Sequence, residues 1–166
     1  MIPQIETLNE KKLIGKRLLM SLADNKTAQL WQSFMPQRHL ITHRLNSHVI
    51  SMQVYNPDYF AHFSPHNKFE KWACVEVSDF TEVPPDMETF VLPAGMYAVF
   101  HYQGLSSDNS IFQYIFATWL PASAHTYALD HRPHFEVLGE KYKNNDPTSE
   151  EDIWIPIKPL LPRSQA

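Results

Sequence analysis

A glutamate in a short and otherwise apolar segment is the strongest candidate for chemistry in this sequence. Residues 134–138 read HFEVL and predict a β-strand. Successive side chains of a strand point to opposite faces, so Glu136 shares a face with Leu138. Burying a carboxylate beside apolar groups is unfavourable unless a cation or a hydrogen-bond donor meets it. Glu136 is therefore a candidate counter-charge for a ligand, and the alternative is a solvated or hydrogen-bonded strand glutamate.

Aromatic side chains that could wall a pocket around this carboxylate form a second group of candidates. The face of an aromatic ring attracts a cation by roughly 0.5–2 kcal/mol, although aromatic side chains at such spacings also fill cores. Glu76 is a second acidic candidate because it alternates in register with Trp72 and Cys74, and a surface position is its alternative. The aromatic candidates are Trp72, Trp154, Tyr55, Phe100, Tyr102 and Tyr114.

The motifs of metal, hydrolase and nucleotide chemistry are missing from the sequence. Two histidine pairs have a four-residue step, His39 with His43 and His62 with His66, but neither has the glutamate of a zincin helix. The sequence holds no Gly-x-Ser-x-Gly elbow and no glycine-rich phosphate loop. The single cysteine, Cys74, excludes an internal disulfide and is expected to be a buried thiol. We expect no metal and no cofactor.

The composition is that of a globular protein, and we expect the protein to act in the cytoplasm. The chain has 166 residues, of which 43% are hydrophobic and 19% are charged, and these values suit one domain. The formal net charge is −4 and the lysines and arginines are scattered, which argues against direct nucleic-acid binding. No leader segment and no apolar run of 18 residues occurs, so we expect no membrane association.

One short motif and the pattern that follows it occur twice along the chain. LADN at residues 22–25 and SSDN at 106–109 each precede an amphipathic run that predicts a helix, and each helix is followed by a late strand containing a tryptophan. Strands are expected at 2–8, 11–22, 48–55, 69–80, 87–92, 96–102, 134–138 and 152–157. The order strand–strand–helix–strand–strand then occurs twice, in pseudo-repeats 2–80 and 87–158. The expected fold is α+β, with an antiparallel sheet, two helices on one face and a central cleft between the halves.

The joint between residues 87–92 and 96–102 predicts a β-hairpin. Pro93, Ala94 and Gly95 separate the two strands, and Gly95 is free to adopt a positive φ.

Several segments together resemble one known family. LPAGMYAVF at residues 92–100, followed by YQG at 102–104, is similar to the central hairpin of the GyrI-like effector-binding family. WLPAS at 119–123, PHFE at 133–136 and DIWIPI at 152–157 are similar to its second helix, its acidic strand and its closing strand. This family includes the small-molecule domains of AraC-type and MerR-type regulators and the stand-alone gyrase-inhibitor proteins. The match spans roughly residues 3–159.

The resemblance implies a duplicated ββαββ fold and places the pocket glutamate of the family at Glu136. No helix-turn-helix segment precedes residue 1, so the sequence predicts a stand-alone effector-binding domain without the DNA-reading part of a regulator. The glycine that many relatives have near Tyr55 is also missing, which leaves the pocket floor open.

These observations favour a binding protein over an enzyme. The leading hypothesis is capture of a small apolar ligand, neutral or cationic, in an aromatic cleft with Glu136 as counter-charge. One alternative is hydrolysis of a reactive electrophile, with Glu136 as base and Tyr55 or Tyr102 steadying the reacting group. Another is a gyrase-inhibitor-like module that binds a protein, either a regulator or a topoisomerase. The oligomeric state is left open.

Overall fold

The fold is an antiparallel sheet carrying helices on one face, as the sequence predicts. The structure is a computed structural model that describes residues 1–160. The bounds of the strands are β1 Gln4–Leu8, β2 Lys11–Ser21, β3 Val49–Val54, β4 Lys68–Val77, β5 Glu88–Leu92, β6 Gly95–Gln103, β7 Tyr127–Leu129, β8 His134–Leu138 and β9 Glu150–Pro159. The helical segments are α1 Thr27–Phe34, η1 Met35–Leu40, α2 Ser110–Tyr114, η2 Ile115–Trp119 and α3 Leu120–Ala122.

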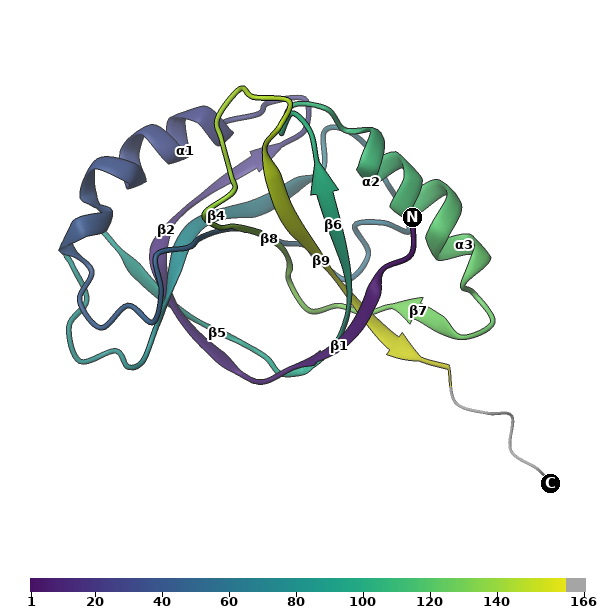
Figure 1. The fold of residues 1–166 in the computed structure, drawn as a ribbon, viewed down its shortest axis with the longest axis horizontal. Coiled ribbons are helices and arrows are strands. Elements are labelled where there is room, and N and C mark those ends of the chain that lie inside the picture. Colours follow the sequence, from purple (N-terminus) through teal and green to yellow (C-terminus); the bar gives the residue numbers. More distant parts are fainter. Residues whose placement is uncertain (161–166) are drawn as a thin grey trace.

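The sheet is curved, and both helical segments lie over its same side. Its strand order is β1-β6-β9-β8-β3-β4-β2-β5, with β7 paired to β9 beyond this path. Figure 1 shows α1 above one half of the sheet and α2 with α3 above the other, while β1 and β5 lie on the side away from the helices. The side of the sheet that the helices cover is called the helix face, and the opposite side is called the inner face.

The two halves of the chain exchange their first strands. Strand β1 pairs with β6 of the second half, and β5 pairs with β2 of the first half. The halves also meet in the middle of the sheet, where β3 pairs with β8. Three of the seams in one sheet therefore join strands from different halves, and the halves share their hydrogen bonding as well as their core.

The prediction of a β-hairpin around residues 93–95 is wrong. Strand β5 pairs with β2, whereas β6 pairs with β1 and β9, so the two strands run in different parts of the sheet. Gly95 is the first residue of β6, and the glycine with a left-handed φ is Gly104, at 153°. A β-carbon at Gly95 would overlap the guanidinium of Arg132, so the glycine provides room for a side chain rather than a turn.

The helices begin where the sequence predicts but are less regular. The side-chain oxygens of Asn25 and Asp108 accept hydrogen bonds from the backbone N–H groups of Thr27 and Ser110, at 3.0 and 2.9 Å. The second helix contains a turn of π-helix, η2, before Pro121. The short strand β7 was missed because three residues carry too little periodicity to predict a strand.

Apolar side chains cover both faces of the sheet. On the inner face Leu13, Trp72, Tyr97 and Phe135 belong to one cluster. On the helix face one cluster packs against α1 and another packs against α2 and η2. No helix among residues 1–160 is long and apolar enough to cross a membrane.

Candidate functional site

The centre of the helix face carries polar side chains where an ordinary core would be apolar. They lie at adjacent positions of three neighbouring strands: Ser51 is opposite Glu136, and Gln53 is opposite both His134 and Lys71. Side chains at such positions are in contact distance of one another. We call this set the polar patch; it consists of Ser51, Gln53, Lys71, His134 and Glu136.

The polar patch is buried between the two helix clusters. The residues Ser51, Gln53, Lys71 and His134 are exposed by only 6–9%. Glu136 is partly exposed as a whole residue, but its Oε2 atom is enclosed. Ala73 and Val75 of the α1 cluster lie beside the patch on β4, and Ile153 of the α2 cluster lies opposite Glu136 on β9. The patch therefore lies at the junction between the halves.

The Glu136 carboxylate is incompletely paired. Burial raises its pKa, and the nearby ammonium of Lys71 and amide of Gln53 act in the opposite direction. Within residues 1–160, Oε2 has no hydrogen-bond partner. Buried polar atoms are nearly always hydrogen-bonded, so an orphan carboxylate oxygen requires an explanation.

Lys71 is the buried cation of the patch. Burial lowers its pKa, while the carboxylates of Glu136 and Glu151 raise it. Its exposed fraction is 9%. A lysine so deeply buried on a sheet is rare unless it is paired, and here two acids supply the compensating charge at longer range.

A second carboxylate, Glu151, lies at the edge of the patch. It is on β9, two residues from Ile153 and therefore on the same face as Glu136. Burial and the negative charge of Glu136 raise the pKa of Glu151 to about 7, against the opposing effect of Lys71. Two acids and one lysine share this region, so its charge changes close to neutral pH.

Aromatic rings cover the end of the patch at His134. The ring of Phe60 stacks on His134 with centroids 5.3 Å apart, and on Phe116 of η2 at the same distance. Tyr55 packs edge-on against His134 at 4.9 Å and also contacts Tyr59 at 4.5 Å. Residues 55–67, which link β3 to β4, thus reach across to the helix of the other half.

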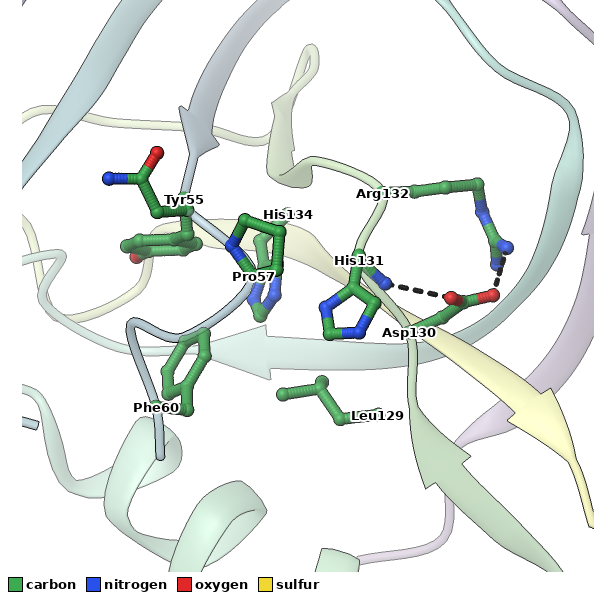
Figure 2. A pocket seen from close by; sticks show the side chains of 9 residues that line it. Tyr55, Pro57, Phe60, Leu129, Asp130, His131, Arg132 and His134 are labelled. Atoms are coloured by element: carbon green, nitrogen blue, oxygen red, sulfur yellow. Dashed lines mark hydrogen bonds and ion pairs between the residues drawn. The ribbon is translucent and has the colours of Figure 1, made fainter. Parts of the chain in front are cut away.

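A cavity of about 160 Å³ opens beside this aromatic cover. Figure 2 shows Tyr55, Phe60 and His134 on one side of it and Asp130 and Arg132 on the other. Asn56, Pro57, Leu129 and His131 complete the lining. A dry cavity of roughly 150 Å³ can hold benzene, so this space suits one aromatic ring. His134 belongs to both the cavity and the polar patch, so the two are neighbours.

The model of integron-associated effector-binding proteins, Cass2, matches residues 4–157. The chain belongs to this family. The match covers both halves of the sheet and confirms the resemblance to GyrI-like effector-binding domains.

Relatives of this effector-binding chain include transcription regulators. The transcriptional regulator BrlR of Pseudomonas aeruginosa is 28% identical over 152 residues, which cover 87% of this chain and 51% of BrlR. The chain therefore spans about half the length of that regulator. The structure of SAV2435 bound to tetraphenylphosphonium is 19% identical, with a TM-score of 0.65, and covers 95% of this chain and 94% of its own. The Vibrio cholerae integron cassette protein VCH_CASS2 is 12% identical, with a TM-score of 0.55 and coverages of 93% and 95%.

The fold brings together only some of the residues predicted for the site. Glu136 and Tyr55 lie near each other. Burial raises the pKa of Tyr55, and the negative charge of Glu136 raises it further. Phe100, Tyr102 and Tyr114 pack in the α2 cluster on the same face. The Tyr102 hydroxyl donates to the Leu105 carbonyl at 2.9 Å, and the Tyr114 hydroxyl donates to the Met1 carbonyl at 2.8 Å.

The other predicted residues lie on the inner face, away from Glu136. Trp72 is buried there and donates from Nε1 to Glu70 at 3.1 Å. Trp154 stacks on Phe135 with centroids 5.3 Å apart. Glu76 forms an ion pair with Lys11 at 2.9 Å. Strand alternation explains this outcome, since these three positions have the opposite parity from the residues that face the helices.

Lys71, Gln53 and His134 were not singled out from the sequence. On β3, Ser51 and Gln53 alternate with Ile50, Met52 and Val54, and such alternation is typical of a strand with one solvated face. The helices cover that face, so its polar residues are enclosed instead. A lysine among the apolar residues of a strand that also carries Phe69, Ala73 and Val75 was the available signal.

Proposed function

We propose that this chain binds a small, largely apolar organic ligand on the helix face, with Glu136 as the anchoring carboxylate. The single observation that carries the proposal is the enclosed Oε2 atom of Glu136, which is without a hydrogen-bond partner among the described residues. A ligand group that donates a hydrogen bond to this oxygen would remove the energetic penalty of a buried oxygen without a partner.

The surroundings of Glu136 suit an aromatic ligand. The cavity beside His134 has room for one ring of a larger ligand, and its lining includes Tyr55 and Phe60. Aromatic ligands gain from such walls through burial of apolar area and through stacking. A positive charge on the ligand would add attraction to the carboxylates and the rings.

The relatives support the same class of function. SAV2435 has been seen with tetraphenylphosphonium, an apolar aromatic cation, on a fold that this chain shares. The match to BrlR supports a role in effector sensing related to transcription regulation. The proposed role is therefore that of an effector-binding module whose occupancy is passed to another component.

The direct test measures binding of rhodamine 6G, an aromatic cation that carries N–H donors, by fluorescence anisotropy. A charge-assisted hydrogen bond contributes about 1.5–3 kcal/mol, so Glu136→Gln should weaken binding by about tenfold or more. Unchanged affinity in this variant would refute the anchoring role of Glu136.

Glu76→Gln is the matched control. It removes one carboxylate from the same sheet, but on the inner face and 60 positions away in sequence from Glu136 (136 − 76). We expect rhodamine 6G to bind this variant as it binds the parent. A loss of affinity in both variants would indicate that net charge, and not the site, governs binding.

A further inference from the structure

The polar patch holds two complementary groups that do not satisfy each other. Oε2 of Glu136 needs a donor. The ammonium of Lys71 can donate three hydrogen bonds, yet within residues 1–160 no carboxylate lies within ion-pair distance of it. Both groups lie on the helix face, with β3 between their strands. A ligand group that bridges the two strands could meet both of these groups.

The position of Lys71 also changes the electrostatics of the site. An isolated buried glutamate attracts any cation. Here burial raises the pKa of Glu136 and of Glu151, and the positive charge of Lys71 opposes that rise in both acids, so this charge also acts where the ligand would sit. A permanent cation with no hydrogen-bond donor would gain from Glu136 but would be repelled by Lys71, and it would leave both hydrogen-bonding groups unsatisfied.

We propose that Lys71 and Glu136 together select ligands whose anchoring group carries both a hydrogen-bond donor and an acceptor, such as a carboxamide, over permanent cations that carry neither. The donor would meet Oε2 of Glu136, and the acceptor would meet Nζ of Lys71. This inference rests on the proposed function, because it specifies the ligand class of the same site.

The geometry supports a bridging ligand over direct pairing of the two side chains. Gln53 lies between them in the sheet, opposite Lys71 on β4 and opposite His134 on β8. Strand β3 lies between the strands that carry Lys71 and Glu136. The fold therefore keeps a buried donor and a buried acceptor apart, and a planar amide presents its N–H and C=O groups to two such partners at once.

The experiment compares two ligands of similar bulk. Tetraphenylphosphonium is a permanent cation without a donor or acceptor, and triphenylacetamide is neutral and carries both. Each is titrated against bound rhodamine 6G, and loss of anisotropy reports displacement. The titrations are run at several values from about pH 7 to pH 8.5, because burial raises the pKa of Glu136 and lowers that of Lys71 and the comparison needs both groups charged.

The parent chain should bind triphenylacetamide more tightly than tetraphenylphosphonium. In Lys71→Met the repulsion is gone, so tetraphenylphosphonium should gain about tenfold in affinity while triphenylacetamide loses affinity. Lys16→Met is the matched control: Lys16 lies on the same face of β2, opposite Ala73, and bonds Ser33 instead of the patch. The ratio of the two affinities should stay at the parent value in this control.

An affinity ratio that is the same in Lys71→Met as in the parent overturns the inference, while the proposed function stands if Glu136→Gln still weakens rhodamine 6G. Lys71→Gln serves if the methionine variant fails to fold, because it keeps a donor and removes only the charge. Lys71→Gln should also bind tetraphenylphosphonium more tightly than the parent does. Absence of that gain in affinity would count equally against the role of the Lys71 charge.

Discussion

His134 should make the protein sensitive to mild acid. Burial lowers its pKa to about 3, whereas an unfolded histidine titrates near 6.5. Between these values the unfolded chain binds a proton that the folded chain excludes, so stability falls as the pH is lowered from 6.5. The expected slope is up to about 1.4 kcal/mol per pH unit for this group. His134→Phe keeps a ring for Phe60 to stack on and should flatten the slope between pH 4 and 6.5 in urea unfolding.

His131→Phe provides the comparison for this prediction. His131 is exposed and lines the same cavity, so its replacement should leave the slope at the parent value. Other acidic groups titrate over the same range, and only the difference between each variant and the parent is interpreted. Equal slopes in His134→Phe and the parent would contradict the assignment of acid sensitivity to His134.

At the same scale, the sequence predicted one residue of the polar patch and missed the others. Glu136 stood out because its strand is short and apolar and because the resemblance pointed to it. Lys71 and Gln53 did not, because a polar residue in an alternating strand normally faces water. The packing of two helices decides their burial, and it depends on contacts between distant segments that periodicity does not encode.

At the scale of elements, Arg132 ties the turn between β7 and β8 to two other strands. Its guanidinium donates to the carbonyl of Ile157 on β9 at 3.1 Å, to the carbonyl of Met96 on β6 and to the carboxylate of Asp130. A methyl group at Gly95 would overlap this guanidinium. Gly95→Ala should therefore displace Arg132 and destabilise the fold by about 1–3 kcal/mol, measured by urea unfolding.

A double-mutant cycle tests whether the loss acts through Arg132. Arg132→Met already removes the hydrogen bonds of the guanidinium. Adding Gly95→Ala should then have little further effect, so the two changes should be strongly non-additive. Gly139→Ala is the matched control, because a β-carbon there would meet His48 at an ordinary 3.4 Å. Additive losses of stability from Gly95→Ala and Arg132→Met would show that the hydrogen bonds of Arg132 are not the reason why residue 95 is a glycine.

The arrangement of elements was less predictable than the elements themselves. Most strands and both helices were expected near their observed bounds, because their alternation and caps are local signals. The pairing of β5 with β2 was not, because a short joint with a glycine is also the signal of a hairpin. The Arg132 side chain occupies the space beside Gly95, and this contact spans 37 residues (132 − 95), so no local pattern encodes it.

At the scale of the whole molecule, the exchange of β1 and β5 should make the two halves unfold together. Leu8 at the end of β1 is 6% exposed and packs in the inner cluster with residues of both halves. A buried Leu→Ala change removes about 2–5 kcal/mol of stability. Leu8→Ala should therefore lower the free energy of opening by the same amount in β4 of the first half and β9 of the second.

Hydrogen exchange followed by mass spectrometry measures this opening strand by strand, because peptides from β4 and β9 report the two halves separately. Ile5→Ala is the matched control on the same strand, since Ile5 is 40% exposed and its truncation should change either value by less than about 0.5 kcal/mol. If Leu8→Ala loosened β9 and left β4 protected, the halves would be independent units joined only along the sheet. Equal losses would instead mean that the junction holding the polar patch persists only while both halves are folded, so that ligand binding there stabilises the entire chain.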